Sequence, residues 1–130
     1  VEANNALFGS LGYLTTGKAK AKLKTTKLDA GSGLFILPGN DVNGYPILSS
    51  NLVPSILTKG STNGTLSAMI FGNWADLMIG QWGGLDILAD PYTLATTGQI
   101  RLIVDSFWDV AVRRAKSFAA IKDAVTTLGA

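Results

Sequence analysis

The pattern of apolar and polar positions predicts an α+β chain in which strands outnumber helices. Short apolar runs at 68–72, 85–89 and 45–49 have the length of strands, and Pro46 marks the entry of the last of these. Residues 99–114 form the longest β candidate, and apolar side chains at both alternating positions indicate a strand that is buried on both faces for part of its length. A helix is the competing interpretation of this stretch, favoured by Ala111, Arg113, Arg114 and Ala115.

Helices are expected in three places. Residues 4–11 are apolar enough for the end of a helix, and Thr15 or Thr16 is placed to cap a second helix through the lysine-rich stretch that follows. Asn73 is placed to cap a third helix over residues 74–81. Helical spacing places one set of apolar side chains on a single face of that third helix: Trp74, Leu77 and Met78. Three glycines limit it to about two turns: Gly80, Gly83 and Gly84.

Glycine, proline and asparagine mark the turns between these elements. Residues 29–44 are loop-like, with a small apolar strand at 34–37. Asn63-Gly64 predicts an exposed tight turn within 58–67, since both residues tolerate a positive φ. Asp90-Pro91 opens a turn, 93–98 is a loop, and 117–122 is a further short strand before a frayed tail that ends at Ala130.

The stretch from Ser67 to Thr93 is apolar, broken by glycine and rich in tryptophan, and it carries no usable catalytic group. The whole chain is 47% hydrophobic and 15% charged, with 15 glycines among 130 residues. One domain of this length buries a sizeable core, and some of its apolar surface is expected to face partner subunits. The alternative is a compact, glycine-rich monomer.

Few residues are suited to catalysis. The chain has no cysteine and no histidine, which excludes disulfides, thiol nucleophiles, the usual zinc sites and imidazole acid–base chemistry. Asp86 and Asp90 lie four residues apart, as do Asp105 and Asp109, and four residues of strand span about 13 Å, too far for two carboxylates acting on one bond. The glycines at 80–84 match no phosphate loop, and Ser10 has no histidine to activate it. We expect no enzyme, no catalytic, cofactor-binding or metal-binding residue, and no cofactor.

Basic residues are concentrated in one segment although the net charge is only +2. They are Lys18, Lys20, Lys22, Lys24 and Lys27. A nucleic-acid site is one interpretation, but no aromatic residue is interleaved for base stacking, so a solvated or subunit-contacting face is favoured. We expect no specific nucleic-acid binding and no small-molecule ligand. No apolar stretch reaches the length of a membrane span and no signal peptide opens the chain, which predicts a soluble intracellular protein without membrane contact.

Three segments resemble a known family. They are ANNALFGSLGYLTTGKAKAKLKTT at 3–26, NGYPILSSNLVP at 43–54, and the stretch from FGNWADLMIGQW to KSFAAIKDA at 71–124. They are similar to tailed-phage and prophage major capsid proteins of the Hong Kong 97-like fold. The resemblance implies a mixed sheet flanked by short helices, with 1–111 as the axial domain and 112–130 returning to the peripheral domain. It also implies that the N-terminal arm, the extended loop and most of the peripheral domain lie upstream of Val1.

The function implied by the resemblance is structural. Such a protein self-assembles into pentamers and hexamers of an icosahedral phage head, with other capsid subunits as partners, and stays in the host cytoplasm before assembly. The glycine-containing loops at 29–44 and 58–64 are candidates for the flexible loops near the axis. Two alternatives stay open: a small module that binds peptide or carbohydrate through three exposed indoles, and an enzyme of unknown type. The indoles are those of Trp74, Trp82 and Trp108.

Overall fold

The computed structural model describes residues 1–29, 31 and 33–126. Its contacts divide the chain into two compact units, each of which is described by itself. Unit 1 comprises Val1–Asp76 and Arg114–Ala130, and unit 2 comprises Leu77–Arg113. The chain therefore leaves unit 1 after Asp76 and returns to it at Arg114.

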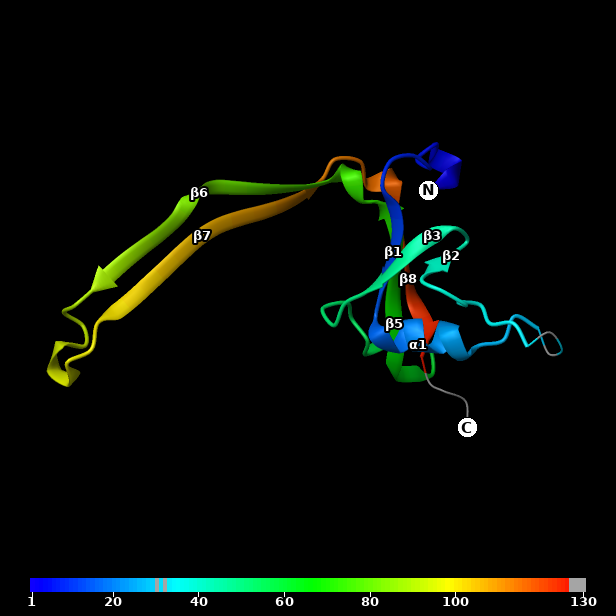
Figure 1. Ribbon diagram of the computed structural model, residues 1–130, viewed down its shortest axis with the longest axis horizontal. Coiled ribbons are helices and arrows are strands. Elements are labelled where there is room, and N and C mark those ends of the chain that lie inside the picture. Colours follow the sequence, from blue (N-terminus) through cyan, green and yellow to red (C-terminus); the bar gives the residue numbers. More distant parts are fainter. Residues whose placement is uncertain (30, 32, 127–130) are drawn as a thin grey trace. The chain divides into compact units, whose positions relative to one another are not determined.

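Unit 1 is built on a six-stranded mixed sheet (Figure 1). Its strands are β1 (Leu11–Thr15), β2 (Asp41–Val42), β3 (Tyr45–Ser49), β4 (Leu57–Lys59), β5 (Thr62–Asn73) and β8 (Phe118–Val125). The order is β2-β3-β1-β5-β4, and β8 also pairs with β5. Strand β1 runs parallel to β3 and antiparallel to β5, so the predicted α+β class with a mixed sheet is confirmed.

The lysine-rich stretch forms α1 (Gly17–Thr25), the α-helix of the described residues. The hydroxyl of Thr16 accepts a hydrogen bond from the backbone N–H of Ala19 at 3.1 Å, which confirms the predicted cap. The same hydroxyl donates to Ser67 Oγ on β5 at 2.9 Å, and Lys20 Nζ donates to the carbonyl of Ile47 on β3 at 3.0 Å. The cap and this lysine thus attach α1 to the sheet.

The core of unit 1 is small. Its most deeply buried large apolar side chains are Leu37, Ile47 and Leu66. The rings of Tyr13 and Tyr45 lie 4.5 and 5.3 Å from the ring of Phe71, between centroids, and join β1, β3 and β5. Aromatic contacts across three strands therefore supplement a limited aliphatic core.

Glycines make room for two aromatic rings on the sheet. Gly72 lies opposite Gly12 on one side and opposite Phe118 on the other. The indole of Trp74 donates from Nε1 to the carbonyl of Gly12 at 3.1 Å. It also packs edge-on against Phe118, with 5.6 Å between ring centroids. A side chain at Gly72 would occupy the space that the ring of Phe118 fills.

Unit 2 is a two-stranded antiparallel ribbon made of β6 (Leu77–Asp90) and β7 (Arg101–Val112), which run side by side in Figure 1. We call these two strands the ribbon. The register shifts between the pairs Trp82–Phe107 and Asp86–Asp105, where Gly83 adopts a φ of 69° that favours glycine.

Short 3₁₀ turns complete the described fold: η1 (Glu2–Asn4), η2 (Trp74–Asp76), η3 (Ala95–Thr97) and η4 (Ala115–Ser117).

The predicted helix over 74–81 is wrong. Asn73 does accept a hydrogen bond from the backbone N–H of Ala75 at 3.2 Å, but the turn that it opens is only η2. The chain then enters β6, so Trp74, Leu77 and Met78 do not share a helical face. The three glycines that were expected to end a helix lie inside this strand. Pairing with the distant β7 outweighs the local helical spacing.

Residues 99–114 are confirmed as a strand by β7, and the helix alternative is wrong. The expected burial on both faces is also wrong, because nearly every β7 side chain is exposed. The strands expected at 45–49, 68–72, 85–89 and 117–122 are present within β3, β5, β6 and β8.

Three local predictions near turns are wrong. The tight turn lies at Gly60 and Ser61, and Asn63-Gly64 falls inside β5. The helix expected over 4–11 is limited to η1, and the strand expected at 34–37 is reduced to an isolated bridge between Lys27 and Phe35. The loop expected at 93–98 contains η3. The frayed tail expected after residue 122 is wrong as far as Val125, because β8 continues to that residue, and the end of the tail at 127–130 lies outside the described residues.

Candidate assembly surface

The ribbon has two faces of different chemistry, because partners in the register point to the same side and successive residues alternate. We call one the apolar face. Its members carry no charge: Leu77, Ile79, Gln81, Ile87, Ala89, Leu102, Val104, Ser106, Trp108, Val110 and Val112. Most of these side chains are exposed, and Trp108 is 59% accessible. Within unit 2 nothing covers this face.

We call the opposite side the acidic face. It carries Met78, Gly80, Trp82, Asp86, Leu88, Asp90, Arg101, Ile103, Asp105, Phe107, Asp109 and Ala111. Asp86 and Asp105 are direct cross-strand partners, and only Asp90 has a cation, Arg101, as its partner in the register. The one ion pair among the described residues joins Lys59 to Asp123 in unit 1, so the ribbon carboxylates are without ion pairs there.

Asp90 is engaged locally at the end of β6. Its carboxylate accepts hydrogen bonds from the Thr93 hydroxyl and from the backbone N–H of Tyr92, the latter at 2.9 Å. The bond from Thr93, then the backbone bonds and the charge of Arg101, lower the pKa of this carboxyl. Asp90 therefore stabilises the turn. Asp109 Oδ1 accepts a hydrogen bond from the backbone N–H of Val110 at 2.8 Å, whereas the exposed Asp86 and Asp105 accept none among the described residues.

A hollow of about 220 Å³ opens beside Gly80, lined by Met78, Ile79, Gly80, Trp82, Asp109 and Ala111. The missing side chain at Gly80 creates it, since a Cβ there would lie 3.3 Å from the Trp82 ring. An exposed indole on one side and a carboxylate on the other form its walls. Such a hollow suits a cation on an aliphatic stem.

The lysines of α1 are the main basic surface of unit 1. Lys18, Lys24 and Lys27 are exposed, Lys22 is half-buried, and Lys20 is bound to Ile47. The side chains thus spread around the helix, as the sequence predicts. No acidic residue lies among them from 18 to 27.

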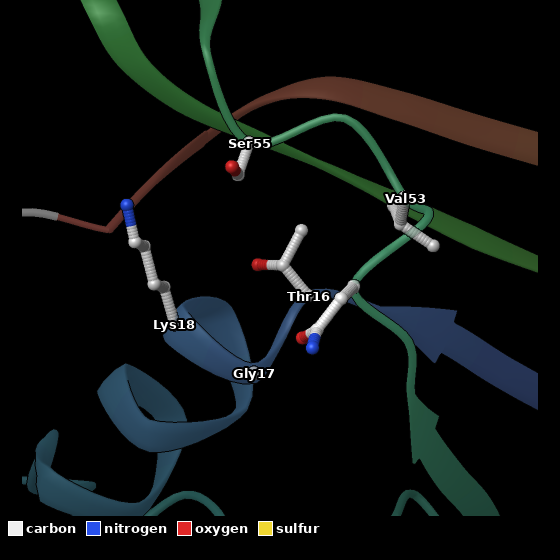
Figure 2. A pocket seen from close by; sticks show the side chains of 6 residues that line it. Thr16, Gly17, Lys18, Val53 and Ser55 are labelled. Carbon is white, nitrogen blue, oxygen red and sulfur yellow. The ribbon is translucent and has the colours of Figure 1, made fainter.

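A hollow of about 390 Å³ lies at the beginning of α1, lined by Thr16, Gly17, Lys18, Asn51, Val53 and Ser55. Figure 2 shows the side chains that line it. The Thr16 hydroxyl is already bonded to Ala19 and Ser67. Lys18 is the only titratable side chain in the lining, and no hydrogen bond joins it to Ser55. The hollow therefore assembles no nucleophile–base pair.

The three tryptophans do not line one cleft. Trp74 is half-buried in unit 1, and its indole N–H donates a hydrogen bond to the carbonyl of Gly12. Trp82 and Trp108, both 59% exposed, lie on opposite faces of the ribbon. The binding-module alternative required a cleft that all three indoles share, and it is therefore not favoured.

A buried polar cluster that the sequence does not reveal lies in unit 1. Asn73 Oδ1 accepts from the backbone N–H of Ser10 at 3.1 Å, and Ser117 Oγ donates to Asp76 Oδ2 at 2.6 Å. Asn73, Asp76 and Ser117 are all buried. The cluster joins the two segments by which the chain leaves and re-enters unit 1. Its only sequence signal was the expected cap at Asn73.

Sequence reasoning named no catalytic or metal-binding residue. In the described ranges, His, Cys, Asp and Glu form no group of three or more that could hold a metal ion. No helix of these residues combines the length and apolar character needed to cross a membrane. The carboxylate pairs considered in the sequence, 86 with 90 and 105 with 109, lie along single strands. The opposition of Asp86 and Asp105 across strands was missed because it depends on register.

The model of the phage capsid family matches residues 2–123, and the chain therefore belongs to the phage capsid family.

The proteins similar to the chain include a curated relative and a solved structure. It is 31% identical over 121 residues to the major capsid protein of Halomonas phage phiHAP-1, an alignment that covers 93% of this chain and 18% of the relative. The chain thus spans less than a fifth of that relative's length. A solved structure titled as the capsid of an empty GTA particle matches with a TM-score of 0.64 at 16% identity, over 89% of this chain and 39% of that one. This match shows the fold.

Proposed function

We propose that this chain is a segment of a phage or prophage major capsid protein, which self-assembles into the pentamers and hexamers of an icosahedral head. The observation that carries the proposal is the match to the phage capsid family over residues 2–123. The protein resides in the virion head, and in the host cytoplasm before assembly. Its partners are other capsid subunits.

The surface of the ribbon supports assembly over catalysis. A two-stranded ribbon by itself is marginally stable in water. The ribbon nevertheless exposes large apolar side chains on both faces, among them Phe107 and Leu102 at 67% and 66% accessibility. Contiguous apolar surface of this kind marks an interaction site. Head-to-tail contacts between copies close a ring when the rotation between neighbours divides a full turn.

The assignment of capsid domains is part of the proposal. Residues 1–111 form the axial domain and 112–130 return to the peripheral domain, with the segments 29–44 and 58–64 near the axis. The position of β8 constrains where the segment 112–130 lies. Strand β8 pairs with β5 in the sheet of unit 1, so the returning segment stays attached to that sheet.

The proposed role needs no enzymatic activity, no small-molecule ligand and no specific nucleic-acid binding. The lysines of α1 lie without interleaved aromatic side chains, which favours protein contacts over base stacking. The carboxylates of the ribbon would repel a phosphate backbone.

Mass spectrometry of purified particles tests the proposal. Phage particles from the strain that encodes this sequence are banded by density, and their major head protein is digested. Peptides from the segments 3–26 and 71–124 are expected within one abundant protein that is several times longer than this chain. Their absence from the particles would contradict the proposal. The isolated chain is expected to associate weakly in sedimentation equilibrium, and closed shells formed by it alone would contradict the assignment as a partial segment.

A further inference from the structure

Charge is segregated along this chain. Four of its nine acidic residues lie on the acidic face of the ribbon: Asp86, Asp90, Asp105 and Asp109. Five of its eleven basic residues lie between 18 and 27, on and just after α1. The acidic face thus carries four carboxylates and one cation, Arg101, whereas the segment 18–27 carries cations alone.

We propose that the acidic face of the ribbon binds the lysine-rich helix α1 of a second copy of this chain. The inference rests on the proposed function and deepens it, because it names the surfaces that meet. The contact is head-to-tail: each copy offers its ribbon to one neighbour and its helix to another.

The spacing of the charges permits this contact. Asp105 and Asp109 lie four residues apart on one face of β7, about 13 Å along the strand. Lys18 and Lys24 are separated by about 9 Å along the helix axis and by about 120° around it. Their flexible four-carbon stems cover the remaining difference. Both lysines are exposed, and neither donates a side-chain hydrogen bond among the described residues.

The hollow beside Gly80 provides an aromatic and an acidic contact for a lysine side chain. A lysine stem entering it would pack on the exposed Trp82 ring and bring its ammonium toward Asp109. The cross-strand pair of Asp86 and Asp105 is unfavourable by itself, because like charges directly opposite one another repel. A cationic partner relieves that repulsion. An acidic or nucleic-acid partner would increase it.

The test compares charge-reversed forms of the full chain by sedimentation equilibrium at low salt. One variant combines Lys18→Glu with Lys24→Glu, and another combines Asp105→Lys with Asp109→Lys. A third carries all four changes. The control, Lys116→Glu with Lys122→Glu, alters exposed lysines of unit 1 outside α1 and changes the net charge as much as the helix variant does. Circular dichroism verifies that each variant is folded.

Either double variant is expected to weaken self-association about ten- to a hundredfold, and the control to leave it nearly unchanged. Mixing the two double variants should restore association as a one-to-one complex, and the four-fold swap should restore it within one chain. Wild-type association should weaken as salt shortens the Debye length from about 10 Å at 0.1 M to about 3 Å at 1 M.

Cross-linking identifies the contact without any substitution. A zero-length carbodiimide reagent applied to a mixture of isotope-labelled and unlabelled wild-type chains should join Lys18 or Lys24 to ribbon carboxylates, in peptides of mixed isotope content. Links confined to one isotope would place the contact within a copy and overturn the inference. Association that is unchanged by both double variants, or a wild-type chain that stays monomeric at every soluble concentration, would also overturn it. Neither result affects the particle experiment, which tests the proposed function separately.

Discussion

The substitution Gly72→Ala probes the tightest packing in unit 1. A Cβ at Gly72 would overlap Phe118 Cδ1 and lie 2.8 Å from both Cε1 and Cγ of that ring. The φ of Gly72 lies outside the left-handed region, so alanine at this position introduces no backbone strain. The ring itself must move, and it is held edge-on against Trp74 at 5.6 Å. The substitution therefore tests a steric contact alone.

The expected cost follows from three effects. Forcing an extra carbon into a packed site costs about 1–3 kcal/mol. Disturbing the edge-on aromatic pair costs about 0.5–1.5 kcal/mol more. Replacing glycine by alanine in a strand stabilises the folded state by about 0.5–1 kcal/mol, which offsets part of this cost. We expect Gly72→Ala to lower the free energy of unfolding by about 1–3 kcal/mol. With Phe118→Ala already present the clash is gone, and the same change should be neutral or stabilising by up to about 1 kcal/mol.

Urea denaturation of a double-mutant cycle measures this coupling. The background carries Trp82→Phe and Trp108→Phe, so that the fluorescence of Trp74 reports on unit 1 alone. Gly17→Ala is the matched control, because a Cβ there meets nothing within 4 Å and alanine favours the helix. The steric argument would be refuted if Gly72→Ala destabilised unit 1 equally with and without the Phe118 ring.

Three further predictions concern polar groups of unit 1. Ser117→Ala removes the donor to buried Asp76 and should cost about 1–3 kcal/mol in urea denaturation, whereas Ser61→Ala, at an exposed turn of the same unit, should cost nothing measurable. Thr16→Ala removes the α1 cap and should cost about 1–2 kcal/mol; Thr16→Ser should recover most of it, and equal losses would refute the cap. The bond and charge of Lys59 lower the pKa of Asp123, so their pairing stabilises the fold above the ordinary carboxyl pKa and is lost as pH falls through the lowered value. NMR titration should find a higher Asp123 pKa in Lys59→Met, and an unchanged pKa would contradict the pairing.

Much of unit 1 was predictable because its signals are local. Thr16 followed by a stretch of good helix formers specifies α1 through one cap bond to Ala19. The apolar runs at 45–49 and 68–72 have the length and composition of strands, and both are strands. The partners of those strands depend on longer-range contacts. The parallel pairing of β1 with β3 and the antiparallel pairing of β5 with the distant β8 have no local signal.

The segment 74–81 shows how a local pattern misleads. Trp74, Leu77 and Met78 satisfy helical spacing, and Asn73 forms part of the expected cap. The same residues also suit a strand once Val112 and Ala111 lie opposite Leu77 and Met78. Those partners are more than thirty residues away, so no window of ordinary length includes them. Pairing over the whole ribbon then decides the conformation.

The candidate surface was predictable in composition but not in geometry. Its tryptophans, glycines and aspartates were all visible, and their lack of catalytic partners favoured packing over chemistry. The division of the ribbon into an apolar and an acidic face depends on the shift in register around Gly83, which places Asp86 opposite Asp105. A one-residue difference in that register would exchange the faces along one strand.

The incorrect burial prediction for 99–114 points to the same conclusion as the family match. Apolar side chains at both alternating positions indicate a strand that needs cover on both sides. Within unit 2, Val104 and Phe107 face opposite ways and both are exposed, so the ribbon does not provide that cover. A sequence that retains apolar residues on two open faces is favourable only where other protein surface meets it. In a shell protein that surface comes from the rest of the polypeptide and from neighbouring subunits, which is why the pattern is typical of assembly and the isolated ribbon leaves it uncovered.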